Sequence, residues 1–171
     1  CSPYYHPILP LLCDSSIANV SNPHDPLPQP PFVHPDDAEW HIREGLNYFE
    51  KSLGFRPEGM WPSEGSVSDH ACALMCKEGI RYFATDEQVL FRSKGYHGKN
   101  LSDRSELFKL HRLETEHSTI DCVFRDHGLS DGIGFMYSKY PAKQASQQFI
   151  KHIKDIGNHW SGQQPPLVSV I

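Results

Sequence analysis

Short apolar runs alternate with amphipathic segments along most of the chain. A run of four to seven residues rich in Val, Ile, Phe, Tyr and Leu is typical of a buried strand. Such runs predict strands at 59–62, 80–84, 107–113, 121–124 and 167–171.

Three longer segments carry apolar residues at the spacing of a helix. The first has Ala38, Ile42 and Leu46 on one face, with Asp36 or Asp37 as its predicted cap and Gly54 as its end. The second extends from a cap at Ser66 or Ser68 to Gly79, and a short helical segment is also expected after residues 85–87. The third covers residues 142–160 and carries an apolar face made of Ala145, Phe149, Ile153 and Ile156.

The order of these elements indicates a fold class. Strands that alternate with helices favour a parallel α/β sheet, open or closed. Between the first residues and the first long helix, residues 19–35 are rich in proline and show no periodicity, which predicts a long loop.

Acidic residues follow three of the predicted strands. Glu64 comes after the first, Asp86 and Glu87 after the second, and Asp126 after the fourth. Parallel strands open their carboxyl ends onto one face, where ligands bind, so these acids are expected to converge on one cleft. Acids here also cap the following helix, and for Asp86 and Glu87 we favour that interpretation.

Composition excludes several classes of partner. Sixteen Lys and Arg against 21 Asp and Glu give a net charge of −5, and no basic run exceeds two residues, which argues against nucleic acid and anionic membranes. No apolar run approaches the ~20 residues of a membrane span. Five cysteines without a CxxC pair favour free thiols, and the eleven histidines show no zinc-ligand spacing, so we expect no metal and no cofactor.

Two carboxylates facing each other in a cleft with aromatic walls are the requirement of glycoside hydrolysis. Trp61 and Tyr4 or Tyr5 could stack on sugar rings, or they could be ordinary core or rim aromatics. Arg125 could influence the protonation of Asp126, although neighbours along a strand point to opposite faces.

Three stretches, at 2–12, 59–68 and 123–135, carry the sequences SPYYHPILPLL, GMWPSEGSVS and VFRDHGLSDGIGF. They resemble three of the five conserved regions of glycoside hydrolase family 57, in the family's order, and look closest to its amylopullulanase and α-amylase-like members. The resemblance implies part of a distorted parallel (β/α)7 barrel, a retaining mechanism and α-glucan substrates.

Carried over by position, the resemblance makes Glu64 the nucleophile and Asp126 the general acid and base. It places His6 and Trp61 in the subsite of the attacked glucose, with Asp131 in contact with substrate or holding the loop, and Tyr5 stays a candidate for stacking on the sugar.

The first and last of the family's conserved regions have no counterpart here. We therefore expect residues 1–171 to be the central part of one glycoside hydrolase catalytic barrel, incomplete at both ends, whose activity in isolation is doubtful. Residues 2–6 lack the basic and apolar regions of a signal peptide, which favours a cytoplasmic location.

Two alternatives stay open. A metal-dependent polysaccharide deacetylase would need an Asp and two His on one ion, and His6, Asp126 and His127 are conceivable ligands. A non-catalytic carbohydrate-binding fragment would use Trp61 and the tyrosines without chemistry, although Glu64 between proline and glycine argues against it.

Overall fold

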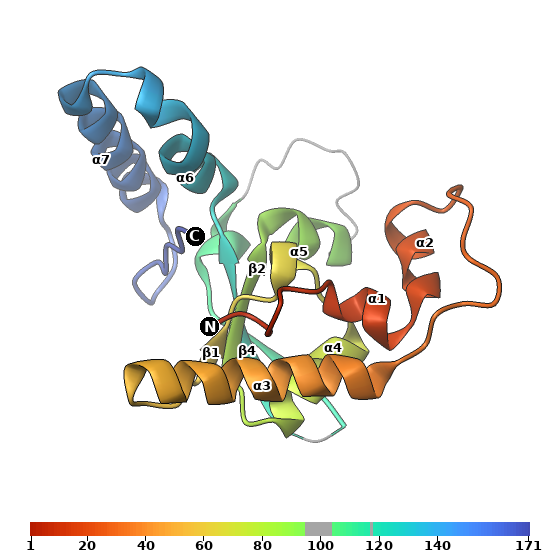
Figure 1. Ribbon diagram of the computed structural model, residues 1–171. Coiled ribbons are helices and arrows are strands. Elements are labelled where there is room, and N and C mark those ends of the chain that lie inside the picture. Colours follow the sequence, from red (N-terminus) through yellow and green to blue (C-terminus); the bar gives the residue numbers. More distant parts are fainter. Residues whose placement is uncertain (95–103, 117) are drawn as a thin grey trace. The chain divides into compact units, whose positions relative to one another are not determined.

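A four-stranded, mostly parallel sheet with the strand order β1-β2-β4-β3 organises the structure, a computed structural model that describes residues 1–94, 104–116 and 118–171 (Figure 1). Its strands are β1 (Gly59–Met60), β2 (Tyr82–Asp86), β3 (His111–Glu114) and β4 (Thr119–Arg125). β1 and β2 are parallel, with Gly59 opposite Tyr82, whereas β3 and β4 are antiparallel. The predicted α/β class is confirmed, with an open sheet in the described residues.

The chain forms two compact units. The first contains Cys1–Thr85 and His111–Cys122, and the second contains Asp86–Leu110 and Val123–Ile171. Strands β2 and β4 each begin in the first unit and end in the second.

In the part of the chain that the structure describes, the first unit contains four helices. They are α1 (Leu9–Cys13), α2 (Ala18–Ser21), α3 (Pro35–Leu53) and α4 (Asp69–Lys77). Two 3₁₀ turns, at Ser15–Ile17 and Ser63–Gly65, complete its helical structure in the described residues. The predicted loop at 19–35 is therefore irregular only after Ser21, because α2 occupies its first residues.

The long helix α3 follows the predicted pattern but begins differently. Ala38, Ile42 and Leu46 are buried, as their spacing indicates. The helix starts at Pro35, and neither Asp36 nor Asp37 caps it, since both lie inside the first turn. Proline suits this first position because its missing N–H would have no helical partner, and the two acids there favour the helix dipole. The predicted end is confirmed at Gly54, which has φ of 81°.

Helix α4 begins as one of the two predicted caps requires. The Ser68 hydroxyl accepts a hydrogen bond from the Ala71 N–H at 3.2 Å. Ala71, Cys72, Leu74 and Met75 are then buried.

The second unit contains α5 (Glu87–Ser93), α6 (His127–Asp131) and α7 (Ala142–His159). A 3₁₀ turn at Ser105–Phe108 precedes β3, and a π-helical turn at Gly132–Met136 and a 3₁₀ turn at Tyr137–Lys139 follow α6. In α7 the predicted apolar face exists, but no residue of the helix is buried by the described chain, and Ile153 is 36% exposed.

Several strand predictions were wrong in extent, since the strand predicted at 59–62 covers only Gly59–Met60 and the one predicted at 80–84 covers Tyr82–Asp86. Residues 167–171 form only an isolated bridge, in which Ser169 pairs with Arg125. Within residues 107–113, Leu107 and Phe108 belong to the 3₁₀ turn instead. Both are buried, whereas neighbouring residues of a strand point to opposite faces, so a strand covered on one face would bury only one of them.

All five cysteines are free, as predicted, and Cys13, Cys72 and Cys122 are buried. Within the described parts of the chain, no helix is both long enough and apolar enough to span a membrane.

Candidate active site

Glu64 lies in the short turn that follows β1. Ser63 and Gly65 on either side are buried, while the Glu64 side chain is 75% exposed. A Glu64 carboxylate oxygen lies 3.4 Å from Nε2 of His6. The Glu64 side chain therefore extends into solvent from a backbone that is held by buried neighbours.

The backbone around this contact is unusual. Only three non-glycine residues of the described chain have positive φ, namely Tyr5 at 58°, His6 at 56° and Glu64 at 57°. Left-handed backbone costs an ordinary residue of order 1–3 kcal/mol, and such residues cluster at functional sites. Here all three occur in the two segments that meet at the His6–Glu64 contact.

Hydrogen bonds hold the Glu64 turn in the first unit. The Thr85 hydroxyl, at the end of β2, donates to the Gly65 carbonyl at 2.5 Å. The Trp61 N–H donates to the Cys1 carbonyl at 2.8 Å, which ties the start of the turn to the N-terminal segment. Ser63 Oγ is buried and has no hydrogen-bond partner among the described residues.

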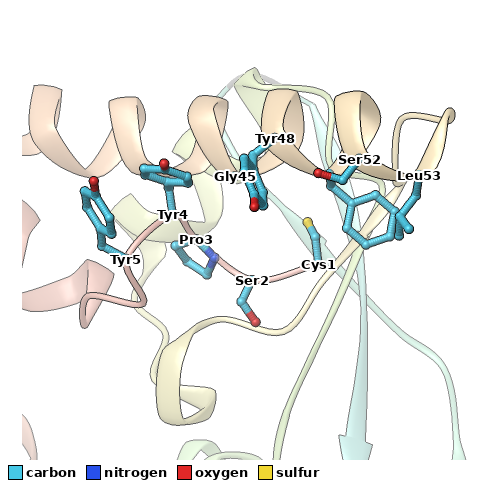
Figure 2. A pocket seen from close by; sticks show the side chains of 10 residues that line it. Cys1, Ser2, Pro3, Tyr4, Tyr5, Gly45, Tyr48, Ser52 and Leu53 are labelled. Carbon is cyan, nitrogen blue, oxygen red and sulfur yellow. The ribbon is translucent and has the colours of Figure 1, made fainter.

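The N-terminal segment also borders a groove of about 640 Å³ (Figure 2). Its aromatic lining comes from Tyr4 and Tyr5 on one side and from Tyr48 and Phe49 of α3 on the other. The Tyr4 and Tyr48 rings are 5.7 Å apart, and Tyr5 is 80% exposed. Tyr5, which precedes His6 in the chain, is therefore accessible to a ligand. Trp61, the other predicted stacking residue, is half-buried.

Asp126 belongs to the second unit and is 1% exposed. It follows β4, whose residues are buried in alternation, so that Phe124 and then Asp126 occupy covered positions. Its carboxylate caps α6 by accepting the Leu129 N–H at 2.8 Å. This cap fixes the orientation of the side chain.

The cation beside Asp126 is Arg104, which sequence reasoning missed. Arg104 Nη2 lies 3.3 Å from Asp126 Oδ2 and 2.5 Å from Glu87 Oε2. Arg125, the predicted neighbour, forms its ion pairs with Asp86 and Asp131 instead, because adjacent strand residues point to opposite faces.

Glu87 has more contacts than a helix-terminal acid requires. It is 6% exposed and accepts both the Arg104 guanidinium and the His127 N–H, the latter at 3.0 Å. A signal for this burial exists in the sequence, since Glu87 shares one helical face with the buried Leu90 and Phe91.

Asp86 confirms the capping interpretation and adds an ion network. Its Oδ1 accepts the Gln88 N–H at 2.9 Å, and its Oδ2 lies 2.7 Å from Arg125 Nε and 3.2 Å from His127 Nδ1. Burial alone would raise the pKa of Asp86, but the hydrogen bonds from Gln88, Arg125 and His127 outweigh it and hold the pKa below its ordinary value.

Asp131 closes this network at the end of α6. Its carboxylate lies 2.8 Å from His127 Nε2 and 3.5 Å from Arg125 Nη1. His127 thus has a carboxylate at each ring nitrogen. Among the described residues, no group of three or more His, Cys, Asp or Glu side chains is arranged to hold a metal ion.

Comparison with known proteins gives two findings. The family model described as glycosyl hydrolase family 57 matches residues 1–170. The crystal structure of 4-alpha-glucanotransferase from Thermococcus litoralis matches with a TM-score of 0.62 and 18% identity, over 99% of this chain and 20% of that one. At this identity the likeness concerns the fold alone, and the chain spans about a fifth of that enzyme's length. The search of curated proteins found no match.

Proposed function

Because the chain belongs to glycosyl hydrolase family 57, we propose that it is part of the catalytic domain of a retaining enzyme that hydrolyses α-glucans. The observation that carries this proposal is the left-handed Glu64, exposed on a buried turn and in contact with His6. The fold proposed for the whole catalytic domain is a distorted parallel (β/α)7 barrel, and residues 1–171 form its central part.

Glu64 is the nucleophile of the proposed mechanism. Its carboxylate is accessible, and its backbone is held by buried neighbours, so the oxygen can reach an anomeric carbon from a fixed backbone position. A contact with His6 limits the side-chain rotamers further. Attack forms a glycosyl–enzyme ester and breaks the glycosidic bond.

Asp126 is the general acid and base. It gives its proton to the departing glycosidic oxygen, and it later takes a proton from the water that hydrolyses the ester. The side chain is buried, and the α6 cap orients the carboxyl group. The mechanism requires the two carboxyl groups to lie ~5–5.5 Å apart.

Aromatic and ionic side chains supply the remaining roles. Tyr5 and Trp61 offer ring faces to the C–H surface of a sugar, and His6 provides a hydrogen bond beside the attacked residue. Asp131 is held by Arg125 and His127, which favours a role in fixing the loop over direct contact with substrate.

The first test replaces the nucleophile. Glu64→Gln in the full-length natural protein should lower kcat on an α-glucan at least about a thousandfold, because an amide cannot form the ester. The matched control is Glu58→Gln, an exposed glutamate of the same unit that pairs only with exposed Arg81 in the described structure. Near wild-type activity of the Glu64 variant would contradict the assignment.

The second test concerns the acid. Asp126→Asn keeps a side chain that caps a helix, so α6 should persist. The variant should lose far more activity on natural glucans than on aryl glycosides with good leaving groups, since only the former need a proton on departure. Equal losses on both substrates would contradict the role of Asp126.

A further inference from the structure

We propose that Glu87 and Arg104 are a pair of positioning residues that set the protonation of Asp126, an inference that rests on the proposed function of Asp126 as the acid and base. Neither residue needs to touch substrate. Both lie in the same unit as Asp126.

One guanidinium nitrogen joins the three side chains. Arg104 Nη2 is 2.5 Å from Glu87 Oε2 and 3.3 Å from Asp126 Oδ2. The His127 N–H, in the peptide that directly follows Asp126, donates to the same Glu87 oxygen at 3.0 Å. Glu87 is therefore fixed beside Asp126 by one contact through Arg104 and another through the backbone.

The charges in this cluster compete. Glu87 and Asp126 are buried, and a buried carboxylate is strongly affected by the nearest cation. Arg104 is 41% exposed and lies closer to Glu87 than to Asp126. Glu87 thus competes with Asp126 for the guanidinium and places a second negative charge beside it.

Other charged groups complete the surroundings. His152 of α7 approaches the same face of Gly128 as Asp126 Oδ1 does. A separate network of ion pairs lies beside this cluster and consists of Asp86, Arg125, His127 and Asp131. These groups are unchanged in the variants below, so they contribute equally to each profile.

In the proposed reaction, Asp126 transfers the protons, and Glu87 and Arg104 transfer none. Asp126 loses its proton as the glycosidic bond breaks, and Arg104 stabilises the carboxylate that forms. Asp126 then regains a proton from the attacking water as the ester is hydrolysed.

The test measures kcat/KM against pH in the full-length protein, where loss of the acid's proton defines the alkaline limb. Glu87→Gln frees Arg104 for Asp126 and should move that limb about one unit toward lower pH. Arg104→Gln leaves two neighbouring carboxylates and should move it toward higher pH. The double variant should return near the wild-type position.

Opposite shifts distinguish this role from a structural one, which would lower activity without moving the limb. Arg92→Gln, an exposed arginine of α5, is the matched control and should leave the profile unchanged. Shifts in the same direction, or no shift, would overturn the inference. If Glu87→Gln does not fold, Arg104→Gln alone decides, because its side chain is partly exposed.

Asp126→Asn separates this inference from the proposed function. If that variant stays active with its alkaline limb intact, Asp126 is not the acid and the proposed function fails. If it loses activity as expected while the Glu87 and Arg104 variants keep the wild-type limb, only the inference is overturned.

Discussion

Single residues in this chain serve two purposes at once. Asp86 caps α5 through Gln88 and also holds Arg125 and His127, and Asp126 caps α6 while it accepts Arg104. A helix cap restricts a carboxylate to one orientation, and that restriction makes the second contact specific. The sequence offered capping and chemistry as alternatives for these acids, and the structure shows each of the two carboxylates capping a helix and contacting an arginine.

Asp86→Asn tests the ionic part of this double role, since asparagine caps a helix equally well. The pKa of Asp86 is below its ordinary value of 3.8, so its ionic contribution is complete above that pH and is lost as the pH falls through the lower folded value. The variant should reduce the free energy of unfolding by about 1–3 kcal/mol at pH 7. Urea titrations at decreasing pH should show this deficit shrinking once the pH falls below 3.8.

At the scale of elements, the N-terminal segment packs against α3 at a glycine. The Tyr4 N–H donates to the His41 carbonyl at 2.9 Å, and His41 Nδ1 donates to the Tyr4 carbonyl at 2.5 Å. A Cβ on Gly45 would lie 2.7 Å from the Ser2 carbonyl oxygen and 3.0 Å from the Tyr4 nitrogen. The segment that carries Tyr5 and His6 can approach α3 only because position 45 has no side chain.

Gly45→Ala should therefore destabilise the protein by about 1–3 kcal/mol, because backbone atoms must move. In an open helical position the same change is favourable by about 0.5–1 kcal/mol. Gly157→Ala in α7 is the matched control, since nothing lies within 4 Å of its added Cβ. Denaturant midpoints of the two variants should shift in opposite directions, and a stabilised Gly45 variant would contradict the close packing.

Elements defined by local periodicity were predictable, and contacts between distant segments were not. The spacing of Ala38, Ile42 and Leu46 predicted α3 because one covered face determines it. The contact between Arg104 and Asp126 joins segments 22 residues apart, and no local pattern encodes it. Positive φ at Glu64 was also invisible, because only tertiary packing makes a non-glycine residue accept that strain.

The apolar face of α7 was predicted correctly from the periodicity, but its burial was not. Ala145, Phe149, Ile153 and Ile156 share one side of the helix, as the periodicity requires. Periodicity reports which face can be buried, whereas burial also needs a neighbour. No described element covers this face completely.

For the whole molecule, the proposed nucleophile Glu64 and the proposed acid and base Asp126 imply a double displacement. A double displacement inverts the anomeric carbon twice. The full-length protein should therefore release the α-anomer as its first product from an α-glucan, followed by slow mutarotation. Proton NMR of the anomeric signals during early turnover measures this, and an initial β-anomer would contradict the retaining mechanism.

The alternation along β4 also has a consequence for sequence change. Ile120, Cys122, Phe124 and Asp126 are buried at every second position, so three core residues and the proposed acid follow one two-residue period. Inserting one residue just before Asp126 would shift the two-residue period and turn the carboxylate away from its buried position, even though every side chain is retained. A change of length in β4 would therefore displace the proposed acid from its buried position, although no residue of the site is substituted.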